Sequence, residues 1–193
     1  MKKSTLFLSS IALIATISLG LVSCSKKESN KSASSSEQTE KKPDRFLPID
    51  SVTIYGDKID SEYFKKNDLT LINIMATWCG PCVKEMPELQ EINEEDNGFG
   101  VIGIVVDTYD EATASAIESA IAEAKNIASK TGVEYPLSIP TQDFLERTLK
   151  KVAALLPMSY VVDQNGKIVK GPIAGAKNKT EWLNLLNSVK AGL

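Results

Sequence analysis

The sequence contains no histidine and only three cysteines, Cys24, Cys79 and Cys82. A zinc site takes about four ligands, drawn from cysteine, histidine and carboxylate side chains. Iron–sulfur clusters take about four thiolates. Because Cys79 and Cys82 have no imidazole to assist them, we expect no metal at this pair and no other cofactor.

The chain also lacks an excess of basic residues, with 22 lysines and arginines against 25 acidic residues and a formal net charge of -3. Nucleic-acid-binding surfaces are normally basic, so this class of partner is not expected. Aromatic residues make up only 6%, but hydrophobic residues reach 42% of the 193 positions. The sequence therefore predicts one ordinary folded domain with additional segments.

Beyond its first two dozen residues, the chain has no apolar run long enough to span a membrane. Near its start, Lys2 and Lys3 precede a largely apolar stretch from Leu6 to Val22, a pattern typical of an export signal. The following Leu21-Val22-Ser23-Cys24 resembles a bacterial lipobox, in which a peptidase cuts before the cysteine. We therefore predict a lipoprotein signal peptide over 1–23, with an uncleaved transmembrane anchor as the alternative.

In this interpretation Cys24 carries diacylglycerol on its thiol and a further acyl chain, such as palmitate, on its amine. The attached lipids would hold the protein on the outer face of the cell membrane. Residues 25–44 contain no aromatic and no large aliphatic side chain, so they cannot order themselves by burial. We predict a lipidated, flexible tether over 24–45 and a folded domain over 46–193.

Within the folded domain, apolar runs alternate with helix-like segments. We expect helices over 61–66, 81–93, 111–130 and 141–153, and a last helix that begins at a capping box formed by Asn178 and Glu181. Strands are expected over 51–55, 69–75, 98–106, 135–139, 158–162 and 167–169. The last two flank Asn165-Gly166, a strong hairpin signal. This order predicts an α/β fold, with a central mixed β-sheet flanked by helices on both faces.

The cysteine pair lies in Thr77-Trp78-Cys79-Gly80-Pro81-Cys82, between a predicted buried strand and a predicted helix. A thiolate attacks disulfides, and the N–H groups and dipole at a helix N-terminus favour the anion. We therefore predict that Cys79 is a reachable nucleophile and that Cys82 is the more buried resolving thiol. Two inert structural thiols and a permanent structural disulfide are the alternatives.

Neighbouring residues fit this chemistry. Gly80 would let the backbone turn tightly and let a substrate approach, and Pro81 near the first helical position loses no hydrogen bond. Trp78 either shapes the docking surface or is a core aromatic residue. Glu85 follows Cys82 by three residues on the same helix face, where a partly buried carboxyl with a raised pKa would accept the thiol proton. The alternative for Glu85 is a solvated surface glutamate.

The segment LINIMATWCGPCVKEMP, residues 71–87, resembles the TlpA/ResA-like branch of thioredoxin-fold thiol–disulfide oxidoreductases. The similarity extends over about residues 46–193 and implies a thioredoxin-like fold in an exported, often membrane-tethered protein. Ordinary thioredoxins carry a buried aspartate where this chain has Asn73. Asparagine there, with a glutamate after the cysteine pair, matches this branch and implies a functional role for Glu85.

A second motif, LPMSYVVDQNG over residues 156–166, resembles the cis-proline segment of the same family. The resemblance implies that Pro157 follows a cis peptide bond, faces the cysteines and keeps metals away. It also implies that the Leu156 backbone binds an extended substrate strand. Met158 replaces the threonine that is more usual in the family. Residues 108–153 are longer than the family pattern, and the sequence offers no functional account of them.

These observations predict a monomeric, membrane-tethered, extracytoplasmic protein-disulfide reductase that acts on exported proteins. The Gly-Pro pair between the cysteines resembles that of thioredoxin, a reductant with a potential of about −270 mV. The family implies electrons from a membrane carrier of the DsbD or CcdA type. A disulfide oxidase or isomerase is the first alternative, and a lipoprotein binding module with an incidental cysteine pair is the second.

Overall fold

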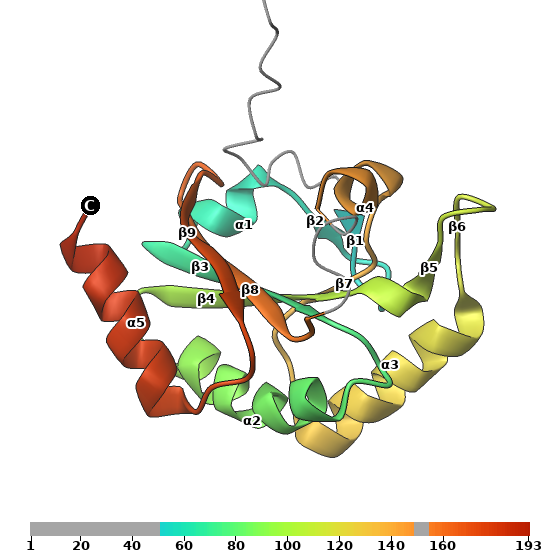
Figure 1. Ribbon diagram of the computed structural model, residues 1–193, viewed down its shortest axis with the longest axis horizontal. Coiled ribbons are helices and arrows are strands. Elements are labelled where there is room, and N and C mark those ends of the chain that lie inside the picture. Colours follow the sequence, from blue (N-terminus) through green and yellow to red (C-terminus); the bar gives the residue numbers. More distant parts are fainter. Residues whose placement is uncertain (1–50, 149–154) are drawn as a thin grey trace, which may run out of the picture. The chain divides into compact units, whose positions relative to one another are not determined.

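The computed structural model describes residues 51–148 and 155–193 (Figure 1). The predicted signal peptide, the tether, Cys24 and the start of the folded domain at residue 46 lie outside the described residues, as does the end of the helix predicted over 141–153. Of the helices that these residues form, none is both long enough and apolar enough to cross a bilayer.

A five-stranded mixed sheet forms the centre of the fold, with the strand order β7-β4-β3-β8-β9. Its strands are β3 (Leu69–Met75), β4 (Phe99–Val105), β7 (Leu137–Ser138), β8 (Met158–Asp163) and β9 (Ile168–Ala174). β4 pairs in parallel with β3 and β7, whereas β8 pairs antiparallel with β3 and β9. Every residue of β3 and β4 is buried, as their continuous apolar runs predict.

Helices cover both faces of this sheet (Figure 1). They are α1 (Ser61–Lys65), α2 (Gly80–Glu94), α3 (Glu118–Thr131), α4 (Gln142–Thr148) and α5 (Lys179–Ala191), with a 3₁₀ turn η1 (Val106–Thr108). Leu71 of β3 belongs to the core formed with α2, α3 and α5, whereas Ile72 belongs to the core that includes Phe64 of α1. Since successive strand residues face opposite sides, one strand serves both cores. The predicted α/β architecture is confirmed.

The predicted strand over 51–55 is shorter than expected. β1 (Ser51–Val52) pairs antiparallel with β2 (Lys58–Ile59), and the chain turns between them. Gly56 has a φ of 94°, a conformation that L side chains rarely adopt, and its N–H donates to the Thr53 carbonyl at 2.9 Å. Thr53 also bridges to Ser138, so this segment lies along the outer edge of β7.

The helix predicted over 111–130 is wrong in its first part. β5 (Tyr109–Asp110) and β6 (Ser115–Ala116) form an antiparallel pair, and α3 begins only at Glu118. The Asp110 side chain accepts a hydrogen bond from the Ala112 N–H at 2.8 Å, and Ala114 has a φ of 50°. Short polar side chains compete with helical bonding in this way despite the alanine-rich composition. The predicted end is correct, because Gly132 caps α3 with a φ of 70°.

The predicted C-terminal hairpin and capping box are confirmed. The Asp163 carboxylate accepts hydrogen bonds from the Asn165 and Lys167 N–H groups at 2.8 and 2.9 Å. β9 runs further than predicted and contains Pro172, which an edge strand tolerates because one side of it needs no ladder hydrogen bonds. Asn178 and Glu181 form the reciprocal capping box that starts α5.

Candidate active site

The cysteine pair lies where the chain leaves β3 and enters α2. Cys79 is the N-cap of α2, and its Sγ accepts a hydrogen bond from the Cys82 N–H at 3.3 Å. A disulfide joins the two residues, whose Cα atoms are 5.3 Å apart. The first-turn N–H groups of a helix have no intrahelical partner, so the Cys79 sulfur lies where a negative charge is stabilised.

Cys79 is 4% exposed and Cys82 is 1% exposed. The lower exposure of Cys82 matches its predicted role as the more buried resolving thiol. In the disulfide form, however, Cys79 is less reachable than the sequence predicts. Trp78, by contrast, is 71% exposed, which excludes a core position for its ring. The residue preceding the nucleophile thus presents a large aromatic surface to solvent.

Gly80 begins α2 without the positive φ that would require glycine, so a tight turn is not the reason for this residue. A Cβ at this position would meet nothing within 4 Å among the described residues, so the space above Gly80 is open to an approaching substrate chain. Pro81 occupies the first turn of the helix, where the absence of its N–H loses no intrahelical bond.

The proline segment lies level with the end of β3. Met158 pairs with Ile74, so Pro157 stands opposite the last residue of β3, from which the chain continues to Cys79. The Leu156–Pro157 bond is cis, and the Pro157 carbonyl accepts a hydrogen bond from the Gly175 N–H at 2.9 Å. Leu156 packs against the core cluster that contains both cysteines. The second predicted motif therefore lies beside the end of the strand that leads to the cysteine pair.

Glu85 is 2% exposed, which excludes a solvated glutamate. Its Oε1 accepts hydrogen bonds from the Lys177 backbone N–H and the Trp182 Nε1–H, both at 2.7 Å. Its Oε2 accepts from Asn73 Nδ2 at 3.1 Å. Burial raises the pKa of Glu85 above its ordinary value of 4.5, and the three donors and the Lys177 charge oppose this rise.

Two residues outside the predicted site belong to its surroundings: Ser159 extends the hydrogen-bond network, and Tyr135 responds to the charge of Glu85. Asn73 Nδ2 also donates to the Ser159 Oγ at 3.1 Å, which links β3 to β8. The Tyr135 ring is buried, and both burial and the charge of Glu85 raise the pKa of its hydroxyl. Neither Ser159 nor Tyr135 carries a sequence signal for this site. Trp182 carries a weak one, because a buried indole N–H needs an acceptor.

Within residues 51–148 and 155–193, no group of three or more cysteine, aspartate and glutamate side chains is arranged to hold a metal ion. The hydrogen bonds from Asn73, Lys177 and Trp182 instead converge on one titratable carboxyl, that of Glu85, which follows Cys82 by three residues on α2. Such an arrangement suits proton transfer to and from a sulfur atom.

A family model described as Redoxin matches residues 44–185 of the chain. Among curated proteins, the thiol-disulfide oxidoreductase ResA of one Bacillus cereus strain is 30% identical over 134 residues, covering 69% of this chain and 70% of that protein. ResA of Bacillus thuringiensis subsp. konkukian (strain 97-27) is 28% identical over 136 residues, with the same coverage of 69% and 70%.

Solved structures share the fold. A thiol:disulfide interchange protein of the thioredoxin family from Chlorobium tepidum TLS superposes with a TM-score of 0.57 at 24% identity, covering 72% of this chain and 92% of that one. A DsbF homologue from Corynebacterium diphtheriae gives a TM-score of 0.55 at 19% identity, with coverage of 73% and 85%. These likenesses confirm the thioredoxin-like fold that the sequence predicts.

Proposed function

Since the chain belongs to the Redoxin family and is a thiol–disulfide oxidoreductase with protein-disulfide reductase activity, we propose that it reduces disulfides of exported proteins outside the cytoplasm. In this proposal a lipid on Cys24 tethers it to the cell membrane. The lipobox-like segment and the tether composition support the location. The observation that carries the chemistry is the Cys79–Cys82 disulfide at the N-terminus of α2.

The first step is attack of the Cys79 thiolate on one sulfur of a substrate disulfide. A bond forms between Cys79 and that sulfur, the substrate S–S bond breaks, and the departing substrate sulfur leaves as a thiolate that takes up a proton. The N-cap position of Cys79 favours its thiolate, because the Cys82 N–H and the positive end of the helix dipole face its sulfur.

The second step is attack by Cys82 on the Cys79 sulfur of the mixed disulfide. Cys82 gives its proton to the Glu85 carboxylate, the Cys79–substrate bond breaks, and the second substrate sulfur leaves and is protonated. Two electrons have then passed from the Cys79–Cys82 dithiol to the substrate, and the protein carries the disulfide seen in the structure.

An extended substrate segment would dock beside Trp78, across Gly80 and Pro81, and along the Leu156 backbone. The exposed ring of Trp78 and the open space above Gly80 support this path. The enzyme must be reduced again after each cycle, and we propose a membrane dithiol carrier of the DsbD or CcdA type as the donor. Deletion of a candidate carrier should leave Cys79 and Cys82 oxidised in cells, and a pair that stays reduced would contradict this donor.

The central test is insulin reduction with dithiothreitol as the electron source. We expect the wild type to accelerate reduction and Cys79→Ser to match dithiothreitol alone. A wild type no faster than Cys79→Ser would instead favour a binding module. Cys82→Ser should trap Cys79 in a mixed disulfide with its natural substrate, whose identity mass spectrometry would then give.

The direction of exchange is tested by the reduction potential against glutathione. We expect a value near that of thioredoxin, about −270 mV, and a value well above it would favour the oxidase or isomerase alternative. The anchor is tested separately by cell fractionation. Cys24→Ala should release the protein from the membrane fraction, whereas Cys79→Ala should remain there and retain the mass of the lipid.

A further inference from the structure

The two oxygens of the Glu85 carboxyl have different surroundings. Oε1 accepts two short hydrogen bonds, from the Lys177 backbone N–H and the Trp182 Nε1–H. Oε2 accepts one longer bond, from Asn73 Nδ2 at 3.1 Å. The donors to Oε1 come from the first turns of α5 (Trp182) and from the segment just before that helix (Lys177), whereas the donor to Oε2 comes from the sheet.

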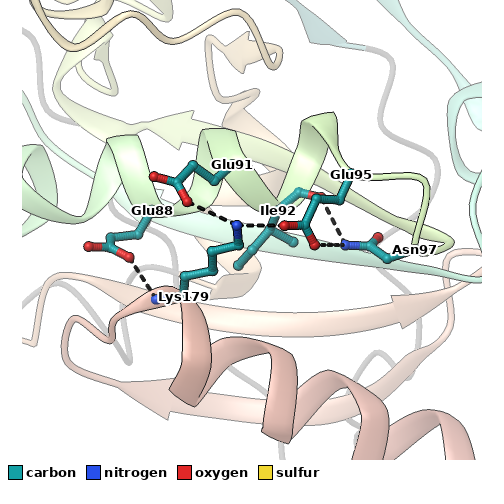
Figure 2. A network of polar contacts seen from close by, with 6 residues as sticks. All are labelled: Glu88, Glu91, Ile92, Glu95, Asn97 and Lys179. Atoms are coloured by element: carbon teal, nitrogen blue, oxygen red, sulfur yellow. Dashed lines mark hydrogen bonds and ion pairs between the residues drawn. The ribbon is translucent and has the colours of Figure 1, made fainter.

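The start of α5 is fastened to α2 by carboxylates on one face of α2 and at its C-cap. Glu88 accepts a hydrogen bond from the Lys179 backbone N–H at 2.8 Å, and the Lys179 ammonium pairs with Glu91 at 2.9 Å and with Glu95 (Figure 2). The capping box of Asn178 and Glu181 stabilises the first turn of α5, the turn that makes these contacts with α2. The donors to Oε1 are therefore held by the same helix that carries Glu85.

We propose that Trp182 is a positioning residue for Glu85: with the Lys177 N–H it anchors Oε1, so that proton exchange with Cys82 takes place at Oε2. This inference rests on the proposed function, in which Glu85 accepts the Cys82 proton. In that step the Cys82 S–H bond breaks and an Oε2–H bond forms, with no other reactant.

The anchor is compatible with both charge states of the carboxyl. When Oε2 carries the proton, Oε1 is a carbonyl oxygen that still accepts both N–H groups. The indole can then stay in place while the charge changes, which keeps Oε2 aimed in one direction. N–H donors stabilise the ionised carboxyl more than the neutral one, so removal of the indole donor should raise the pKa of Glu85.

Other charged and titratable groups surround Glu85. The Lys177 ammonium lies 5.4 Å from the centre of the Trp182 ring and favours the ionised carboxyl. The Tyr135 hydroxyl is neutral near pH 7 even at its ordinary pKa of 10.0, and burial and the charge of Glu85 raise that pKa further. The thiols of Cys79 and Cys82 titrate only in the reduced protein, so the disulfide form isolates the titration of Glu85.

The test measures the pKa of Glu85 in the full, oxidised chain by ¹³C NMR of labelled glutamate side chains, with Glu85→Gln as the assignment control. Trp182→Phe should raise the proton affinity of Glu85 by about tenfold, the scale of one hydrogen bond to a charged group. Leu186→Ala, a second fully buried position of α5, is the matched control and should leave the pKa unchanged. An unchanged pKa in Trp182→Phe, or an equal shift in Leu186→Ala, would overturn the inference.

A measurement on the unmutated indole covers the case in which Trp182→Phe does not fold. The Trp182 Nε1–H resonance should shift with the titration of Glu85 in the wild type and lose this dependence in Glu85→Gln. Trp78→Phe assigns the two indole signals. An indole resonance that does not change through the Glu85 titration would exclude the anchor.

Thiol-exchange rates as a function of pH separate this inference from the proposed function. If the pKa of Glu85 shifts in Trp182→Phe and the rate profile does not follow it, the anchor stands and the role of Glu85 as proton acceptor fails. If the pKa does not shift while Glu85→Gln still slows exchange, the proposed function stands and the anchor fails.

Discussion

The Asp107 carboxylate accepts hydrogen bonds from both the backbone N–H and the hydroxyl of Thr77, with the N–H 3.1 Å from each carboxylate oxygen. Asp107 lies in η1, directly after β4, and Thr77 lies in the loop between β3 and Cys79. The segments that follow the two parallel strands β3 and β4 are thus joined to each other by hydrogen bonds. The contact holds the loop that presents Trp78 and Cys79.

Replacement of Asp107 should loosen this loop. Asp107→Ala removes the acceptor of two hydrogen bonds, and we expect a loss of about 1–3 kcal/mol of unfolding free energy with faster hydrogen exchange at the Thr77 amide. Thr77→Val removes only the hydroxyl and should have a smaller effect. Urea titration and amide exchange by NMR measure both quantities. Equal protection of the Thr77 amide in Asp107→Ala and the wild type would show that the carboxylate does not restrain the loop.

The raised pKa of Glu85 predicts how stability depends on pH. The folded state holds the carboxyl proton more tightly than the unfolded state, because burial penalises the charge. Glu85 therefore imposes no penalty below its unfolded pKa, and it lowers stability as the pH rises from that value through the folded pKa. Each unit of difference between the two pKa values corresponds to about 1.4 kcal/mol.

Glu85→Gln removes this titration and keeps a carbonyl oxygen for the Lys177 N–H and the Trp182 indole N–H. In the oxidised protein, the stability of the variant relative to the wild type should therefore increase with pH across the window between the two pKa values. Urea titrations at several pH values measure the difference. A difference that is constant with pH would mean that Glu85 has the same pKa in the folded and unfolded states.

The Lys179 ion pairs predict a salt-dependent contribution to stability. Lys179→Met removes the contacts of one ammonium with Glu91 and Glu95, so we expect a lower urea midpoint, with a difference that shrinks as salt screens the charges. Lys190→Met, near the other end of α5, removes a single pair with Asp68 and should have a smaller effect. Equal urea midpoints for Lys179→Met and the wild type at low salt would show that these ion pairs do not contribute to stability.

The exposure of Trp78 predicts that its replacement will change activity without changing stability. Its ring is exposed, so Trp78→Ala should change the free energy of unfolding by less than about 0.5 kcal/mol. Exchange with protein disulfides should slow, because the docking surface is lost, whereas exchange with a small disulfide should change little. Tyr55→Ala, which removes another exposed aromatic ring, is the control. If Trp78→Ala slowed both reactions equally, the ring would act on Cys79 itself.

The parts of the fold that the sequence predicts correctly are those with local causes. β3 follows its continuous apolar run, and α5 begins at the capping box of Asn178. The strand pair of β5 and β6 escapes prediction because the hydrogen bond from the Ala112 N–H to Asp110 and the positive φ of Ala114 depend on a turn that composition does not reveal. The resemblance to a known family, rather than any local pattern, places Pro157 near the cysteines.

In the candidate site too, local features can be predicted from the sequence, whereas contacts between distant residues cannot. The spacing of Glu85 from Cys82 places both on one face of α2, and the structure buries both. The contact between Glu85 and Trp182 joins residues 97 positions apart, and it exists because α5 packs against α2. No periodicity in either helix encodes that contact, so it appears only when the packing is known.

Pro172 has a consequence for how copies of this protein meet one another. The outermost strand of an open sheet exposes unpaired N–H and C=O groups, onto which a neighbouring molecule can add its own strand. On β9, Pro172 removes one of these donors, and at the opposite margin Thr53 covers part of the two-residue β7. Both features reduce the free backbone that a second molecule could use for intermolecular β-augmentation, which disfavours edge-to-edge aggregation.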